Sequence, residues 1–219
     1  MPHDTQRSGF FEEIAVRNYT EALEILGHDF IAPVQAANAW GLKYLFVQLA
    51  CLATLVPPRE ILLWARDNNC IVIPGPPRKM NLLDIRKLDS RSFRGPTAWY
   101  EEQKEEFSLN DTVDTEWLVV RKGWIPDSTG KNWLNQIAML GIDERVPNAA
   151  QAAWAFNTYT KVAGENPFTD IAYVRTSSVY SGGGHVYVGY FWDEANLVVI
   201  GDSDDTARAF IGLASCRIF

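Results

Sequence analysis

Three cysteines and one histidine could carry nucleophilic chemistry. The cysteines are Cys51, Cys70 and Cys216, and the histidine stands in Gly183-Gly184-His185-Val186-Tyr187-Val188-Gly189. An imidazole that opens a strand can activate a facing thiol, as in a cysteine hydrolase of the cell-wall peptidase type. Such a thiolate usually lies at a helix N-terminus, whereas Cys51 falls within an apolar helical run and Cys70 opens a strand. The hydrolase, with one of these cysteines and His185, is therefore the alternative interpretation.

Other reactive patterns are weaker. Asp202-Ser203-Asp204-Asp205 offers oxygen ligands for Ca²⁺, but the spacing of a calcium-binding loop and its distal glutamate are absent. Pro74 to Arg78 matches a proline-rich peptide ligand, a pattern that ordinary loops also produce. The sequence contains no phosphate-binding loop, no dinucleotide-binding fingerprint and no pair of carboxylates at a spacing that indicates catalysis. We therefore expect no cofactor, no metal site and no enzymatic activity.

Composition and charge exclude further classes. The formal net charge of -7, without a cluster of Lys and Arg, argues against a nucleic-acid partner. The longest apolar stretch, Tyr44 to Val56, has 13 residues, fewer than the roughly 20 that a membrane span needs. It predicts a buried helix. The N-terminus lacks the apolar run of a secretory signal. The sequence leaves the compartment undetermined, with the cytoplasm as the default expectation and surface or virion display as the alternatives.

The elements that must position these residues divide the chain. Helical spacing runs over 10–26, 34–55 and 59–68, and a strand is expected at Cys70 to Ile73. A polar, loop-like stretch covers 89–110, a strand begins at Trp117, and short and long helices are expected over 131–140 and from Pro147 to a glycine stop at Gly164. Period-two strand patterns follow at 171–174, 185–191, 197–200 and 211–219. The chain is thus predicted to be α+β, with a helical region over 1–68 and a sheet-containing domain over 69–219.

Residues 176–219 differ in composition from the rest. Lys, Gln, Met, Glu and Trp together supply 35 of residues 1–175 but only two of the last 44, Trp192 and Glu194. Tyr, Gly, Ser, Asp, Val and Ala replace them. Tyr, Ser and Gly are favoured at contact surfaces, because a rigid aromatic ring gives area at low entropic cost and small residues let the surface conform. The same residues also form ordinary strands and turns.

This tail resembles the variable proteins of diversity-generating retroelements, in particular those of small-genome archaea and bacteria. The resemblance is carried by Tyr173 to Val179, Gly189-Tyr190-Phe191, Asp205 to Arg208 and Ile211 to Phe219. It extends upstream to the stretches NCIVIPGPPRKMNLL (69–83), WLVVRKGWIPDSTGKNW (117–133) and VPNAAQAAW (146–154), and so covers residues 69–219.

The resemblance implies a C-type-lectin fold with antiparallel sheet and flanking helices, which displays randomised side chains on one face to an unidentified protein or surface-glycan ligand. In that family, randomised AAC codons yield Tyr, Ser, Gly, Asp and similar residues but not Lys, Gln, Met, Glu or Trp. Trp192 and Glu194 depart from that origin, and Cys216 and Ile218 stand where Ala and Lys are expected.

Carried over by position, the variable region is about 176–219. The implied contact residues are Tyr180, Gly182, Gly184, His185, Tyr187, Tyr190, Trp192, Val198, Ile200, Gly201, Ser203, Ala209 and Phe210. Binding energy should concentrate in the aromatic anchors Tyr187, Tyr190, Trp192 and Phe210. The implied framework positions between them are Val186, Val188, Phe191, Leu197, Val199, Ile211 and Leu213, whose period-two spacing buries one face of a sheet.

Overall fold

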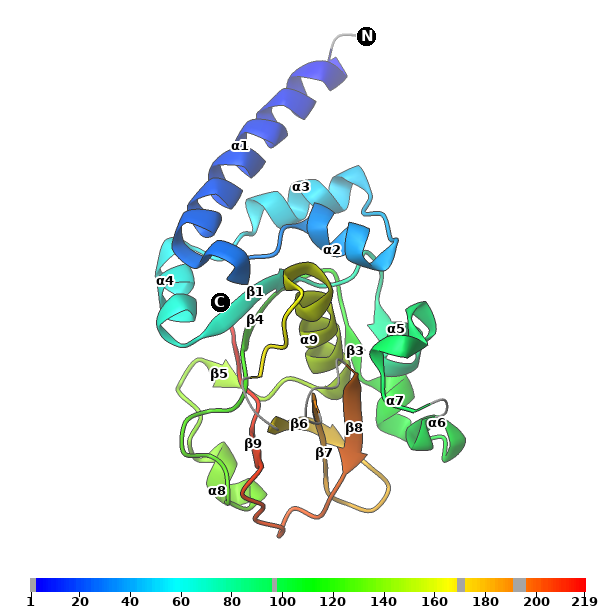
Figure 1. Ribbon diagram of the computed structural model, residues 1–219. Helices are drawn as coiled ribbons and strands as arrows, with labels where there is room; N and C mark the ends of the chain where they lie inside the picture. Colours follow the sequence, from blue (N-terminus) through cyan, green and yellow to red (C-terminus); the bar gives the residue numbers. More distant parts are fainter. Residues whose placement is uncertain (1–2, 96–97, 169–171, 191–195) are drawn as a thin grey trace.

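The computed structural model describes residues 3–95, 98–168, 172–190 and 196–219, and the side chains of these residues apart from 3–14 and 172. Within the described residues, only helices precede residue 70 and only strands follow residue 171, with both kinds of element between them, so the predicted α+β class is confirmed. Figure 1 shows the N-terminal helices at one end of the molecule and the strands of the tail at the other.

Four helices precede the first strand: α1 (His3–Leu26), α2 (Pro33–Trp40), α3 (Phe46–Thr54) and α4 (Arg59–Asp67), with the short 3-10 helix η1 (Gly27–Asp29) after α1. The continuous helix predicted over 34–55 is wrong, because α2 ends at Gly41. That glycine has φ 64°, and its N–H caps the carbonyls of Ala37 and Asn38. A left-handed glycine of this kind terminates a helix.

The stretch from Tyr44 to Val56 is not the buried helix that we predicted. Leu45, Phe46 and Val47 are 66%, 59% and 61% exposed, and only Leu52 and Ala53 of α3 are buried. The helix rests on its neighbours along one side, where the Leu52 carbonyl accepts a hydrogen bond from Trp117 Nε1 at 2.8 Å. Within the described part of the chain, no single helix has the length and hydropathy to cross a membrane; α3 and α4 reach them only as a pair bent by 80°.

The first sheet has the strand order β1-β4-β10-β5, with every pair antiparallel. Its strands are β1 (Cys70–Pro74), β4 (Trp117–Arg121), β10 (Cys216–Arg217) and β5 (Glu144–Arg145). Alternate residues of β1 and β4 enter two different cores, which explains why both strands are apolar throughout. Val72 and Val119 pack with α1 and α4, whereas Ile71 and Val120 pack with α9.

Helix α9 (Ala149–Ala163) lies between the two sheets (Figure 1). Asn148 and Gln151 form a capping box at its start, and Gly164, with φ 74°, ends it where the sequence predicted. Every residue from Ala149 to Tyr159 is buried. Such burial requires the small alanines that dominate its first turns, because neighbouring layers approach this helix from all sides.

Shorter elements cover the edge of this core. They are β2 (Met80–Asn81), α5 (Leu82–Leu88), η2 (Ser90–Ser92), α6 (Trp99–Glu102), α7 (Glu106–Asn110), β3 (Thr112–Val113) and α8 (Trp133–Ile137). Strands β2 and β3 pair antiparallel. The loop-like stretch predicted over 89–110 thus contains three short helical segments.

The tail forms the second sheet, with strand order β8-β7-β6-β9. Its strands are β6 (Ala172–Val179), β7 (His185–Tyr190), β8 (Leu197–Gly201) and β9 (Ile211–Leu213). The first three are antiparallel, as predicted, but β9 runs parallel to β6. The single strand predicted over 211–219 is wrong: it divides into β9 and β10, which belong to different sheets.

Asp89 links the end of α5 to α9 and should make stability depend on pH. Its carboxylate accepts a hydrogen bond from Lys161 Nζ at 2.6 Å, which, with bonds from Ser92 and Arg91, lowers its pKa from 3.8 to about 2. Because the folded-state pKa is depressed, this contribution is present above pH of about 4 and is lost as the pH falls toward about 2. The difference in unfolding free energy between wild type and Asp89→Asn, measured by denaturant titration, should shrink over that range. A pH-independent difference would contradict this linkage.

Candidate ligand-binding surface

The second sheet has one face in the main core and one face turned away from α9. Val186, Val188, Leu197 and Val199 are at most 6% exposed and belong to the main core. The implied framework positions Ile211 and Leu213 are also buried, and Phe191 lies outside the described residues. The alternation along β7 and β8 is therefore the one that the framework residues predicted.

The opposite face carries a small separate cluster formed by Tyr173, Tyr187, Val198 and Ile211. The rings of Tyr173 and Tyr187 meet edge to face at 5.3 Å, and the exposed ring of Phe210 lies 6.0 Å from Tyr173. Ile200 and Phe210 remain 36% and 43% exposed. This face and the loops at its end, 180–184 and 202–210, are called the outer surface from here on.

Loop 202–210 forms the end of the molecule farthest from α1 (Figure 1). Its exposed residues include Ser203, Ala209 and Phe210, three of the implied contact positions. Two of the three acidic groups of this loop are already engaged: Asp202 pairs with Arg208 at 2.6 Å and Asp204 with His185. Among the described residues, no group of three His, Cys, Asp or Glu side chains is arranged to hold a metal ion.

His185 is held tightly between two partners. Its ring stacks on Trp133 with centroids 3.6 Å apart, and its Nδ1 lies 2.8 Å from Asp204 Oδ1. The backbone N–H of His185 donates to the same oxygen at 2.9 Å. The side chain is only 13% exposed. His185 thus joins β7 to loop 202–210 and to the first residue of α8.

A buried carboxylate, that of Glu105, fixes the position of turn 180–184. Glu105 is 3% exposed, and it accepts hydrogen bonds from the Ser181 backbone N–H at 2.8 Å and from Ser181 Oγ at 2.6 Å. Tyr180 packs edge to face on Trp99, with ring centroids 6.1 Å apart. Gly182 is exposed at the tip of the turn.

Four implied contact residues are buried, which corrects the expected surface. Tyr187 and Val198, at 7% and 6% exposure, face outward but are covered within the small cluster, and burial raises the pKa of Tyr187 to about 12. Tyr190 is 1% exposed and points into the main core, where its hydroxyl lies 3.1 Å from Thr160 Oγ1 and its pKa is raised by burial. Gly184 is also buried.

The prediction that Tyr190 is an aromatic anchor for ligand is wrong for a geometric reason. Tyr187 and Tyr190 are three residues apart on one strand, and a period of two places such residues on opposite faces. The remaining aromatic anchor of β7's end, Trp192, lies outside the described residues.

Three glycines among the implied positions have restricted space. A Cβ at Gly184 would overlap the carbonyl oxygen of Asp202, and a Cβ at Gly182 or Gly201 would overlap the Tyr180 ring. At Gly182 and Gly201 the obstacle is a side chain that can rotate. At Gly184 it is backbone, so this position should tolerate no side chain.

Gly184→Ser is therefore expected to lower the free energy of unfolding by about 1–3 kcal/mol, the usual cost of overpacking. Ala209→Ser, an exposed change of similar size in the same surface, should stay within about 0.5 kcal/mol of wild type. Guanidinium unfolding of the two variants measures both values. Equal free energies of unfolding for the two variants would show that the backbone near Gly184 shifts to accommodate a side chain at little cost.

Cys70 and Cys216 have the properties of buried structural thiols. Burial raises the pKa of Cys70 to about 12 and also raises the pKa of Cys216. Cys51 is exposed on α3, in the N-terminal helical region. A nucleophilic cysteine needs the opposite shift, toward a stable thiolate, and the contacts of His185 described above are with Asp204 and Trp133.

Sequence reasoning missed the residues that support the outer surface: Arg175, Gln136, Glu105 and Trp133. Arg175 and Gln136 are fully buried, yet they stand 39 positions apart in the sequence. Arg175 directly follows the strand predicted over 171–174, and this single charged residue beside an apolar strand is the only local signal. Comparisons of the chain with protein-family models, with curated proteins and with solved structures give no match.

Proposed function

We propose that this chain is a non-enzymatic ligand-binding protein of the retroelement-diversified class, built on a C-type-lectin scaffold. Its outer surface presents variable side chains to a protein or surface-glycan ligand. The proposed contact residues with exposed or half-exposed positions are Tyr180, Gly182, His185, Ile200, Gly201, Ser203, Ala209 and Phe210. Of these, His185 offers a ligand little of its ring, because one face stacks on Trp133, Nδ1 binds Asp204, and the side chain is 13% exposed.

The observation that carries the proposal is the separation of two kinds of residue along the tail. The apolar framework residues Val186, Val188, Leu197 and Val199 enter the main core, while most of the described positions implied to vary, Tyr190 excepted, lie on the opposite sheet face or in the two adjoining loops. A sheet tolerates substitution on its outward side because that side contributes little to the core. The same segment is the one depleted in Lys, Gln, Met, Glu and Trp.

The chemistry of the outer surface suits binding more than catalysis. Ile200 and Phe210 offer exposed apolar area, and Arg208 lies over the Phe210 ring at 6.0 Å. Aromatic and arginine side chains are the groups that most often dominate binding energy at interfaces. With Tyr187 and Tyr190 withdrawn into the protein, Phe210 is the leading anchor among the described residues.

Resequencing the gene from many cells of its source population, together with its flanking DNA, tests the proposal. We expect substitutions clustered at the codons for Ile200, Ser203, Ala209 and Phe210, and few or none at those for Gly184 and Tyr190. A reverse-transcriptase gene and a near-identical template repeat should lie nearby.

Substitutions spread evenly along the gene, with no such neighbouring genes, would overturn the retroelement assignment. The absence of catalysis has a separate test, in which Cys51, Cys70 and Cys216 are replaced singly by Ser. Loss of a measurable peptidase or amidase activity in any of these variants would overturn the binding-protein proposal.

A further inference from the structure

Loop 202–210 is held by its backbone carbonyl groups. Six carbonyls between Ser203 and Ile211 accept hydrogen bonds from residues outside the loop, some from side chains and some from backbone N–H groups. Trp133 N donates to Asp204 O at 3.0 Å, Gly130 N to Arg208 O at 2.9 Å and Tyr173 N to Phe210 O at 3.2 Å. The other three carbonyls, of Ser203, Thr206 and Ile211, are bound by buried side chains.

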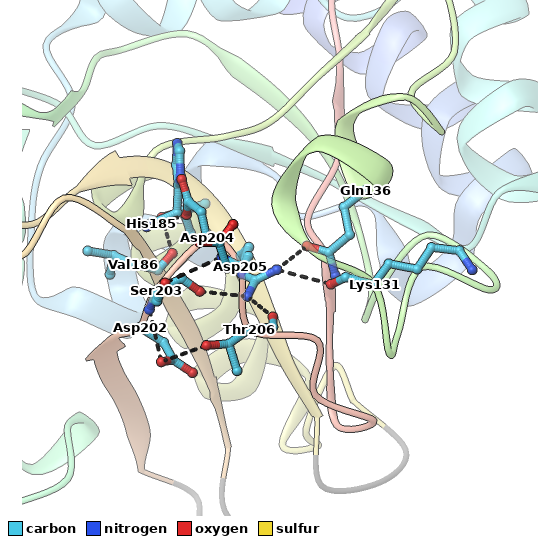
Figure 2. A network of polar contacts seen from close by, with 11 residues as sticks. Lys131, Gln136, His185, Val186, Asp202, Ser203, Asp204, Asp205 and Thr206 are labelled. Carbon is cyan, nitrogen blue, oxygen red and sulfur yellow. Dashed lines mark hydrogen bonds and ion pairs between the residues drawn. The ribbon is translucent and has the colours of Figure 1, made fainter.

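Arg175 binds two of them. Its guanidinium is fully buried, and its Nη2 donates to Thr206 O at 2.5 Å and to Ser203 O at 3.3 Å. Its Nη1 donates to Lys131 O at 3.2 Å and to Gln136 Oε1 at 2.9 Å. Figure 2 shows Lys131 and Gln136 on one side of this group, and Ser203 and Thr206 on the other.

Gln136 extends the same network to the far end of the loop. Its side chain is fully buried, and its Nε2 donates to Ile211 O at 3.1 Å and to Ser128 O at 2.8 Å. Ser128 Oγ accepts the Leu213 N–H at 2.9 Å. Arg175 and Gln136 therefore fix both the start and the end of the loop.

The side chains of the loop contribute little to this arrangement. Ser203, Asp205, Ala207, Ala209 and Phe210 are exposed, as is Arg208. Asp202 and Asp204 are the exceptions: the Asp202 carboxylate accepts hydrogen bonds from Arg208 Nε at 2.6 Å and from the Ser203 N–H at 2.9 Å, and the Asp204 carboxylate binds His185. A loop held through carbonyls keeps its shape when its outward side chains change, since every residue type supplies the same carbonyl.

We infer that Arg175 is the positioning residue of a backbone-held binding loop, and that Asp205, Ala207 and Arg208 are further ligand-contact positions beside Ser203, Ala209 and Phe210. The identity of the contacts rests on the proposed function; the role of Arg175 does not. The loop has a fixed path and replaceable side chains, so that different copies of the gene present different contacts on one backbone.

The burial of this cation is consistent with the assignment. Burial lowers the pKa of Arg175, while the nearby carboxylates of Asp204 and Asp202 oppose that shift. A guanidinium stays charged in such a setting and carries its donors in a rigid planar fork. Lysine, with a single nitrogen, cannot reach the same four acceptors, so Arg175→Lys keeps the charge but loses the geometry.

Hydrogen exchange followed by mass spectrometry on wild type and Arg175→Lys tests the inference without any ligand. We expect amides in 203–211 to exchange on the order of tenfold faster or more in the variant, by local opening. Arg121→Lys is the matched control, since Arg121 is another buried strand arginine that hydrogen-bonds a carbonyl, that of Asn68. It should lower stability without selective exchange in the loop.

Selective exchange of 203–211 in Arg175→Lys alone would support the inference, whereas unchanged or uniformly faster exchange would overturn it. Should Arg175→Lys fail to fold, Gln136→Met takes its place, with faster exchange expected at 206–213 and an unchanged loop again counting against the inference. Resequencing of the gene tests the proposed contact positions: codons 205, 207 and 208 should vary between copies of the gene, as codons 203, 209 and 210 are expected to do. Invariance of those three codons while the others vary overturns their assignment and leaves the proposed function standing.

Discussion

Tyr190→Ala is expected to lower the free energy of unfolding by about 3–5 kcal/mol, the range for truncating a buried aromatic side chain. The ring is 1% exposed, packs at 5.8 Å from Phe168, and places its hydroxyl beside Thr160 and Asn157. Removing it leaves a cavity between β7 and α9. Chemical unfolding monitored by circular dichroism measures the loss.

Phe210→Ala is the matched control, because the two residues are aromatic members of the same tail. Phe210 is 43% exposed, and its removal should cost no more than about 1 kcal/mol. Equal losses for the two variants would contradict the division of the tail into a buried framework and an outer surface. A large loss of stability in Phe210→Ala alone would show that Phe210 belongs to the buried framework.

The second large effect is expected at Trp154, which joins the N-terminal helices to the rest of the chain. Its ring stacks on Trp40 of α2 with centroids 5.2 Å apart, and its Nε1 donates to Pro74 O at the end of β1 at 2.8 Å. Trp154→Ala should lower the free energy of unfolding by about 3–5 kcal/mol. Trp40→Ala and the double variant complete a cycle whose coupling energy should be about 0.5–1.5 kcal/mol or more.

This cycle also bears on the boundary predicted at residue 68. If 1–68 and 69–219 unfold as one cooperative unit, both single variants keep a single transition by fluorescence and by circular dichroism. Additive effects, or two separate transitions, would show that the helical region is energetically independent of the sheets. In that case Trp40 and Trp154 would be in contact without contributing a measurable coupling energy.

The sequence predicted those parts of the fold that depend on local pattern. The end of α9 at Gly164 follows from a left-handed glycine, which acts within a few residues; the helix begins at Ala149, two residues after the predicted start at Pro147, because Asn148 and Gln151 form the capping box. The burial of Val186, Val188, Leu197 and Val199 follows from the pleat of a strand. The α+β class follows from the change of period along the chain.

Long-range contacts account for the differences between the predicted and the observed structure. The apolar residues of 44–56 matched a buried helix, but whether a helix is covered depends on the neighbours that pack against it, and α3 is left open along one side. The outward position of Tyr187 was predictable from period two, whereas its burial was not, because Tyr173 and Ile211 come from other strands. Arg175, Gln136 and Glu105 act through residues 28 to 76 positions away, and no local pattern identifies such pairs.

Strand β10 lies inside the first sheet, between β4 and β5, although it is made of Cys216 and Arg217. It is translated after every codon of the proposed outer surface. A copy of the gene whose reading frame shifts anywhere in 180–210 would therefore lose this inner strand, which would leave β5 without its partner and β4 paired only with β1. Under the proposed function, only copies of the gene that are rewritten in frame would complete the first sheet, so an intact outer surface and an intact first sheet would depend on the same reading frame.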